Sequence, residues 1–247
     1  MGTPRLILIT RPATDAALLA ADIKKNGWQP LIAPLLTIHP LTESIPDLQT
    51  ALDQATAVLV TSSNGVRALA QFDSRRDTVL LAVGPMTAAT ARQEGFTKIV
   101  TAAGDVTNLT SLVKSKLQPQ DGPLLHISGT HQAGDLAAAL GAAGFTIRRL
   151  VLYKAQAATT LPDEVIMALK QGHLAAVSLF SPRTAAIFVD LIHTAGLASL
   201  CRTVAALCLS KAVAQKASVL PWKKTLIATQ NEAGALIEML PRIESEG

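Results

Sequence analysis

The chain has 247 residues, a formal net charge of +4, and 49% hydrophobic but only 3% aromatic residues. This length is enough for one large domain or two modest domains with real hydrophobic cores. Lysine and arginine are scattered, and no basic tract carries interleaved aromatic residues, which argues against a nucleic-acid partner. The mild positive excess fits an anionic small molecule better.

The N-terminal region predicts a strand rather than a targeting segment. Its apolar run, Leu6–Thr10, is too short for the core of a signal peptide, and Arg11-Pro12 follows directly. The longest uncharged run, Asn26–Thr42, carries three prolines and is not a plain membrane helix. We therefore expect a cytoplasmic protein that does not contact a membrane.

Two stretches show the same strand–turn–helix pattern. Ala57–Ala70 reads AVLVTSSNGVRALA, and Ala176–Val189 reads AVSLFSPRTAAIFV. Each has a β-branched apolar run, a turn of small polar residues or proline, and an alanine-rich run typical of a helix. The unpaired N–H groups at such a helix start, with the helix dipole, can bind a carboxylate or phosphate. The alternative is that Ser62 and Ser181 only cap their helices.

The similarity extends along nearly the whole chain. Leu6–Trp28 resembles Leu124–Phe145, and Val83–Ala91 resembles Leu209–Ala217. The segment KIVTA near residue 100 likewise resembles TLIAT near residue 227. The offset between copies drifts only from about 117 to 127 residues, always in the same order. The sequence therefore predicts an internal duplication.

Each copy alternates short apolar strands with helices, the pattern of a parallel α/β sheet. Strands are predicted near Leu6–Thr10, Val58–Thr61, Val79–Val83, Lys98–Thr101, Leu124–Ser128, Ala176–Phe180, Val204–Leu209 and Thr225–Ala228. Two further extended pieces, Leu31–Leu41 and Arg148–Ala157, are expected to pair as a two-stranded tether. Ligands of open α/β folds bind beyond the carboxyl ends of the strands, so we expect two lobes to face each other across a cleft.

Sequence patterns for metals and phosphates are absent. The five histidines show no H-x-x-x-H or H-x-H spacing, and neither a G-x-G-x-x-G nor a P-loop motif is present. Cys201 and Cys208 are predicted to be buried free thiols rather than a disulfide or a metal pair. These absences argue against a metal site and against a dinucleotide or P-loop nucleotide site.

Several short motifs, taken in order, resemble the uroporphyrinogen-III synthase family. They are ITRP at the start, PLL at 34–36, TSSNGV, AVGPMTA, the HISG…GDL…GF run, LVLYKA at 150–155 and LFSPRTA. The resemblance implies two flavodoxin-like lobes joined by a two-stranded β-ladder, with the chain crossing twice. It implies lobe 1 at 1–33 and 159–247, the ladder at 34–41 and 149–158, and lobe 2 at 42–148.

The resemblance also implies an activity. The enzyme would be a cyclising hydro-lyase that closes hydroxymethylbilane, a linear tetrapyrrole with eight carboxylates, to uroporphyrinogen III with inversion of ring D. It would use no cofactor or metal, and it is expected to be a monomer, in transient contact with the upstream bilane-forming enzyme. An alternative from another class is a cytosolic bilobal sensor that binds a small anion without catalysis.

Tyr153, the sole tyrosine of the chain, falls on the tyrosine of the family motif and is the candidate catalytic acid. We expect its hydroxyl to be exposed in the cleft, although a ring packed in the tether is the alternative. The candidate substrate-binding residues are Arg11, Thr61, Ser62, Ser63, Asn64, Gly84, Thr87, Ser128, Gly129, Ser181, Pro182, Arg183, Thr184, Ser210 and Lys211. Where the family commonly has a second threonine this chain has Val213, which puts any role of that hydroxyl in doubt.

Overall fold

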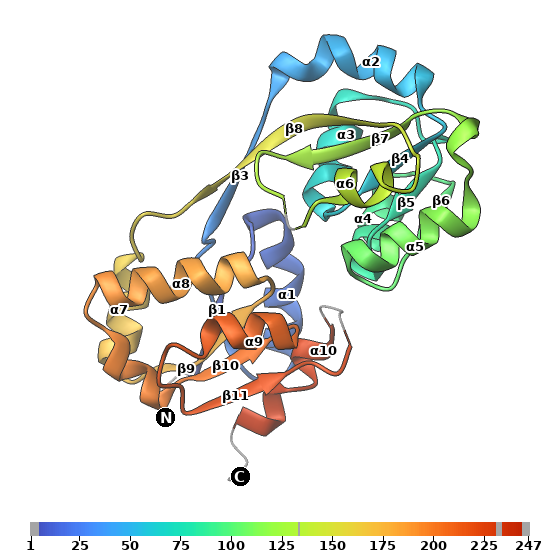
Figure 1. Ribbon diagram of the computed structural model, residues 1–247. Helices are drawn as coiled ribbons and strands as arrows, with labels where there is room; N and C mark the ends of the chain where they lie inside the picture. Colours follow the sequence, from blue (N-terminus) through green and yellow to red (C-terminus); the bar gives the residue numbers. More distant parts are fainter. Residues whose placement is uncertain (1–4, 133, 231–233, 244–247) are drawn as a thin grey trace. The chain divides into compact units, whose positions relative to one another are not determined.

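The computed structural model describes residues 5–132, 134–230 and 234–243. The chain divides into two compact units, unit 1 (Met1–Thr37 and Gln156–Gly247) and unit 2 (Ile38–Ala155). Each alternates strands with helices around its own sheet (Figure 1). The predicted fold class, two parallel-sheet α/β lobes, is confirmed.

Unit 1 contains a five-stranded sheet in the described residues, in the order β11-β10-β9-β1-β2, with parallel pairs throughout. Its strands are β1 (Leu6–Ile9), β2 (Gln29–Ile32), β9 (Leu174–Leu179), β10 (Ala205–Cys208) and β11 (Lys224–Ile227). Its helices are α1 (Ala13–Lys25), α7 (Asp163–Lys170), α8 (Pro182–Thr194), α9 (Lys211–Ala217) and α10 (Gly234–Ile237), with 3₁₀ turns η3 (Ala198–Thr203) and η4 (Leu240–Ile243). Numbered within the unit, the strand order is 2-1-3-4-5, which is flavodoxin-like.

Unit 2 contains the sheet β3-β8-β7-β4-β5-β6. Its strands are β3 (Leu36–Pro40), β4 (Ala57–Val60), β5 (Leu80–Ala82), β6 (Ile99–Thr101), β7 (Leu124–Gly129) and β8 (Ile147–Ala157). Its helices are α2 (Ile45–Gln54), α3 (Ser63–Phe72), α4 (Pro85–Gln93), α5 (Val106–Lys116) and α6 (Leu136–Gly141), with 3₁₀ turns η1 (Thr42–Ser44) and η2 (Pro119–Asp121). Strands β8-β7-β4-β5-β6 repeat the order β2-β1-β9-β10-β11 of unit 1, as the duplication predicts.

Strands β3 and β8 form an antiparallel edge pair, drawn as two long neighbouring strands in Figure 1. The Leu41 N–H donates to the Leu152 carbonyl at 2.8 Å, and the Ala158 N–H donates to the Leu35 carbonyl at 3.1 Å. Residue numbers therefore rise along one segment as they fall along the other.

The predicted extended piece Leu31–Leu41 is not one strand but two. It is split into β2 and β3, which belong to different sheets. The break falls at Pro34, which has no N–H to donate to a sheet. Pro30 and Pro40 lie in β2 and β3, and both strands are edges, where proline is tolerated.

The core of unit 1 is aliphatic with one aromatic stack. Phe188 of α8 is fully buried, and its ring lies 5.8 Å from that of Trp222 between centroids. Cys201 and Cys208 are both buried free thiols, as predicted. Burial raises the pKa of Cys201 to about 11 and that of Cys208 to about 12, so both are poor nucleophiles at neutral pH.

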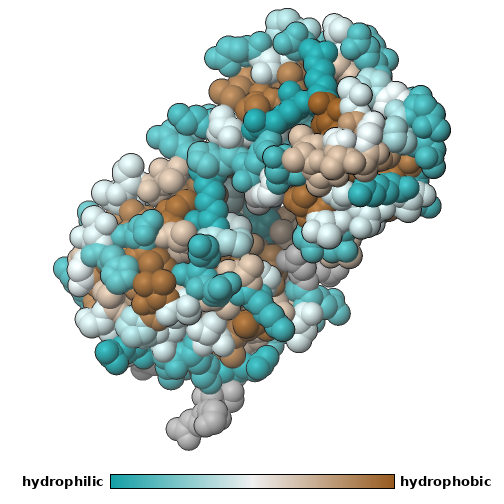
Figure 2. Space-filling model, in the orientation of Figure 1, coloured by the Kyte–Doolittle hydropathy of each residue, from teal (hydrophilic) through white to brown (hydrophobic). Residues whose placement is uncertain are grey.

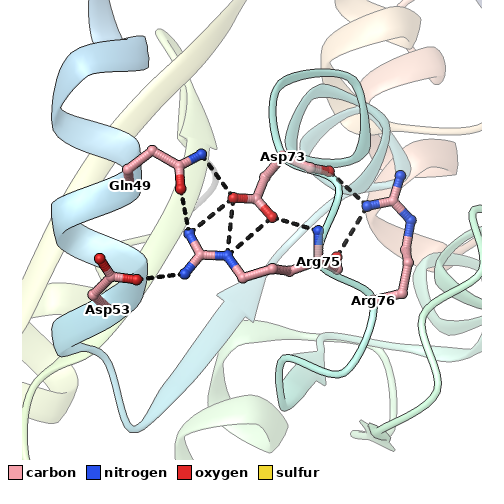
Figure 3. A network of polar contacts seen from close by, with 5 residues as sticks. All are labelled: Gln49, Asp53, Asp73, Arg75 and Arg76. Atoms are coloured by element: carbon pink, nitrogen blue, oxygen red, sulfur yellow. Dashed lines mark hydrogen bonds and ion pairs between the residues drawn. The ribbon is translucent and has the colours of Figure 1, made fainter.

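A polar network around the buried Asp73 ties α2 to the end of α3 in unit 2 (Figure 3). The Asp73 carboxylate accepts from the Arg75 backbone N–H at 2.7 Å, from Arg75 Nη2 at 2.8 Å and from Gln49 Nε2 at 2.9 Å. Burial alone would raise the pKa of Asp73, but these hydrogen bonds and the Arg75 charge outweigh it and hold the pKa below its usual value. The network is fully engaged within the unit, so we assign it to folding rather than to catalysis.

On the face drawn in Figure 2, apolar residues lie in separate patches among hydrophilic ones. Among the helices of the described ranges, none is long and apolar enough to cross a membrane.

Candidate active site

Each sheet has a topological switch point where the strand order reverses. It lies between β1 and β9 in unit 1 and between β7 and β4 in unit 2. Crevices outside the carboxyl ends of strands at such points are where open α/β sheets bind ligands. Most of the predicted site residues follow these strand ends, and a polar cluster forms at the one in unit 2.

Tyr153 and Ser62 form the centre of this cluster. Tyr153 is only 8% exposed, and its phenolic oxygen lies 2.8 Å from Ser62 Oγ. Ser62 is the N-cap of α3, and its Oγ also accepts from the Gly65 N–H at 3.1 Å. The expectation of an exposed tyrosine hydroxyl is therefore wrong, because the pairing of β8 with β7 carries this side chain inward.

Gly129 lies directly against the tyrosine ring. An irregularity after Ser128 shifts the β7–β8 register and pairs Gly129 with Tyr153. A Cβ on Gly129 would meet Tyr153 Cε2 and Cζ at 2.7 Å, closer than real Cβ atoms approach. The Thr130 N–H, next in the chain after Gly129, donates to the Tyr153 carbonyl at 3.1 Å and is therefore already used within the sheet edge.

A buried histidine lies beneath the α3 start. His126 of β7 is 3% exposed, and its Nε2 lies 3.3 Å from Thr61 Oγ1. Burial, with the nearby Arg149 charge, lowers the pKa of His126 to about 4. The imidazole is therefore neutral at physiological pH. Sequence reasoning tested the histidines only as metal ligands and missed this position.

Arg149 completes the cluster. Its Nε donates to Ser128 Oγ at 2.9 Å and its Nη2 donates to the Gly129 carbonyl at 2.8 Å. Ser128 is 3% exposed, and its hydroxyl oxygen is the acceptor for Arg149 Nε. Sequence reasoning missed Arg149, because the contact arises from strand pairing and no local motif marks it.

The start of α4 has a different architecture from that of α3. Gly84 is the N-cap, so no side chain caps the helix. A Cβ there would lie 2.8 Å from the Gly104 Cα, so local packing already requires glycine whether or not a ligand approaches. Thr87 is buried in the first turn, and Thr90 Oγ1 donates to Ser63 Oγ at 2.8 Å, joining α4 to α3.

In unit 1, Ser181 and Ser210 are both N-caps. Ser181 Oγ accepts from the Thr184 N–H at 3.1 Å and lies 2.8 Å from Thr184 Oγ1. Ser210 Oγ accepts from the Val213 N–H at 3.4 Å. Ser62 and Ser181 thus both cap their helices. Capping uses the side-chain oxygen and leaves earlier backbone N–H groups of the first turn outside the helical pattern.

The cationic candidates of unit 1 lie in different settings. Arg11 is nearly buried, forms a 2.9 Å ion pair with Asp15, and stacks on Phe180 with 4.4 Å between Cζ and the ring centroid. Arg183 is half-buried in the first turn of α8, and Lys211 is exposed at the start of α9. The Asp15 carboxylate offsets part of the charge that Arg11 was expected to offer a ligand.

Comparison with known proteins decides the family. The sequence model described as "Uroporphyrinogen-III synthase HemD" matches residues 17–238, most of the chain. The chain belongs to the uroporphyrinogen-III synthase family. The resemblance inferred from scattered short motifs is confirmed.

Individual relatives agree with this assignment. A protein of Synechococcus elongatus named uroporphyrinogen-III synthase is 26% identical over 204 residues, covering 76% of this chain and 75% of that protein. A crystal structure of a mutant uroporphyrinogen III synthase from Thermus thermophilus is similar with a TM-score of 0.61 at 17% identity, covering 97% and 98% of the two chains. The Helicobacter pylori enzyme structure gives 0.60 at 15% identity, covering 97% and 100%. These two likenesses support the two-unit fold.

Proposed function

We infer that this chain is a uroporphyrinogen-III synthase. It converts hydroxymethylbilane to uroporphyrinogen III, with loss of water and inversion of ring D, in tetrapyrrole biosynthesis. The observation that carries this inference is the family match over residues 17–238. The polar cluster around Tyr153 supplies residues suited to the chemistry.

We propose that Tyr153 is the general acid. A pyrrole nitrogen of the substrate pushes electrons toward the hydroxymethyl carbon, its C–O bond breaks, and the oxygen leaves as water with the proton of the phenol. The cationic azafulvene then closes through a spiro intermediate, and the proton that the new macrocycle loses restores the phenol. The 2.8 Å contact with Ser62 Oγ supports this role, because it holds the phenolic oxygen at the start of α3, beside the carboxyl ends of the strands.

The enzyme must also hold a flexible polyanion in the conformation that closes. We propose that backbone N–H groups and side chains at the strand ends bind its carboxylates. In unit 2 the candidates are Thr61, Ser62, Ser63, Asn64, Gly84, Thr87, Ser128 and Gly129; in unit 1 they are Arg11, Ser181, Pro182, Arg183, Thr184, Ser210 and Lys211. The starts of α3, α4 and α8 support this, since helix N-termini favour anions.

The reaction is a dehydration with no change of redox state, and the proposal invokes no cofactor or metal. We propose a cytoplasmic monomer, in keeping with the two buried free thiols, which suit a reducing compartment. Hydroxymethylbilane also closes unaided to the type I isomer. Brief contact with the upstream bilane-forming enzyme would therefore protect the substrate.

The activity is tested with freshly generated hydroxymethylbilane and separation of the product isomers. Wild-type protein should yield the type III isomer. If only the type I isomer forms, even though the substrate binds tightly, the chain is a binding protein and not an enzyme.

The role of Tyr153 is tested with Tyr153→Phe. We expect turnover to fall by roughly 10²–10⁴-fold, the usual contribution of a positioned acid. The product should stay mostly type III at early times. Loss of the Ser62 contact should lower the free energy of unfolding by about 1 kcal/mol.

The control is Ser115→Ala, which removes an exposed hydroxyl that donates to the Leu112 carbonyl and should leave turnover unchanged. Wild-type turnover in a folded Tyr153→Phe variant would remove the catalytic assignment.

A further inference from the structure

The guanidinium of Arg149 is held in place by neutral acceptors. Its Nε and Nη2 donate to Ser128 Oγ and to the Gly129 carbonyl at 2.9 and 2.8 Å. The Gln132 carboxamide lies against the same guanidinium and accepts from Nε when its oxygen faces the arginine. Within the described residues, Nη1 has no hydrogen-bond partner, and the residue as a whole is exposed. One donor edge of a fixed planar cation is thus open to solvent.

The charge of Arg149 is also uncompensated. Arg11, Arg75 and Arg148 each pair with a carboxylate, at 2.9, 2.8 and 3.5 Å respectively. In the described part of the chain, no carboxylate forms an ion pair with Arg149. An immobilised guanidinium with a free edge and no anionic partner suits bidentate or single-edge binding of a carboxylate.

The location of this cation connects it to the proposed acid. The Arg149 guanidinium contacts the Gly129 carbonyl, and the Tyr153 ring lies on the Gly129 Cα. Both groups therefore flank one residue at the carboxyl end of β7. A carboxylate at Arg149 would belong to the part of the ligand closest to the phenol.

We propose that Arg149 binds a carboxylate of the tetrapyrrole on the pyrrole ring that bears the leaving hydroxyl group. This rests on the proposed function and adds a substrate-positioning residue to it. The ion pair fixes the reacting ring against the acid, and the closing chain moves relative to that ring.

A purely structural role, holding the end of β7, makes different predictions. Loss of a structural clamp would lower stability and kcat through the tyrosine position. Loss of a substrate contact would raise KM and weaken binding of an unreactive polycarboxylate. The probe for binding is uroporphyrin III, a stable octacarboxylate whose fluorescence reports its association.

The experiment compares full-length wild type, Arg149→Gln, Arg149→Lys and Arg148→Gln. Arg149→Gln should raise KM and the Kd of uroporphyrin III by about 10- to 100-fold, the loss of one charged hydrogen-bonded contact. Arg149→Lys should recover part of the affinity, since it keeps the charge but not the planar fork. Arg148→Gln is the matched control: it points to the other face of β8 and already pairs with Asp47, so it should behave as wild type.

A second measurement uses unmutated protein. Phenylglyoxal modifies accessible guanidinium groups, and mass spectrometry identifies the modified arginines. Bound uroporphyrin III should protect Arg149 and leave Arg148 reactive. This protection measurement tests the proposal even if the Arg149→Gln variant fails to fold.

Unchanged KM and Kd in a folded Arg149→Gln variant overturn the proposal, and so does a fall in kcat alone. Equal modification of Arg149 with and without the porphyrin overturns it as well. Failure of the proposed function is recognised separately. Wild-type protein would then form only the type I isomer, whatever the porphyrin-binding experiments show.

Discussion

Acidification should destabilise the protein through His126. This imidazole is 3% exposed, and its pKa in the folded chain is about 4, against an ordinary value of 6.5. Between these two pH values the unfolded state binds more protons than the folded state. Stability therefore falls as the pH drops from 6.5 towards 4, and it is unaffected by this group above pH 7.

The magnitude follows from the size of the shift. A difference of 2.5 pKa units corresponds to at most about 3.4 kcal/mol, at 1.36 kcal/mol per unit. Proton linkage for this one group, with its folded and unfolded pKa values, lowers the free energy of unfolding by about 2 kcal/mol at pH 5 and about 3 kcal/mol at pH 4, relative to pH 7.5. Carboxylates titrating in the same pH range add their own contributions to the total loss.

The assay isolates the histidine by difference. Urea unfolding followed by circular dichroism is compared at pH 7.5 and pH 5 for wild type and His126→Gln, whose amide does not titrate. Wild type should lose about 2 kcal/mol more than the variant over this range. An NMR titration of the histidine ring protons provides the folded-state pKa directly. Equal losses in both proteins, or a folded-state pKa near 6.5, would show that burial does not lower the pKa of His126.

Two further predictions concern buried positions of unit 2. Gly129→Ala places a Cβ 2.7 Å from the Tyr153 ring, so unfolding free energy should fall by about 1–3 kcal/mol, the cost of overpacking, and kcat should fall as well. The control is Gly141→Ala, where a Cβ meets nothing within 4 Å. If urea unfolding gives the same stability change for both variants, the Tyr153 ring does not pack tightly against Gly129. Asp73→Asn should cost about 1–3 kcal/mol, because a 4%-exposed carboxylate loses charged hydrogen bonds. The control is Asp77→Asn, in an exposed 4.0 Å ion pair, which should change the free energy of unfolding by less than about 0.5 kcal/mol. Comparable losses in the Asp73 and Asp77 variants would show that the Asp73 network does not stabilise the fold.

The sheets were accessible from sequence because their signals are local. A run such as AVLV at Ala57–Val60 is apolar and β-branched, and its burial on both faces needs no knowledge of its neighbours. The duplication adds a second line of support, because a strand predicted in one copy has a counterpart in the other. The prediction was wrong at Leu31–Leu41, where composition alone does not reveal that Pro34 separates strands of two different sheets.

The polar cluster was only partly accessible, because strand register creates it. Ser62, Gly129 and Tyr153 were singled out, yet their contact depends on the irregularity after Ser128. His126 and Arg149 stand 23 residues apart in sequence and become partners in the β7–β8 register. No local pattern reports a one-residue shift between paired strands, although such a shift decides which side chains meet.

The way the chain is divided between the units bears on the order of folding. Unit 2 is one continuous segment, whereas unit 1 is made of two segments on either side of it. During synthesis, unit 2 is complete before β9, β10 and β11 exist, so it can fold while unit 1 is still missing most of its sheet. Joining the two segments of unit 1 across an unfolded insert of roughly 120 residues would cost about 4 kcal/mol in closure entropy. A folded unit 2 removes most of that cost, because the β3–β8 pairing already brings the two ends of the loop to a hydrogen bond between Leu35 and Ala158. We therefore expect the two segments of unit 1 to assemble faster when unit 2 is already folded.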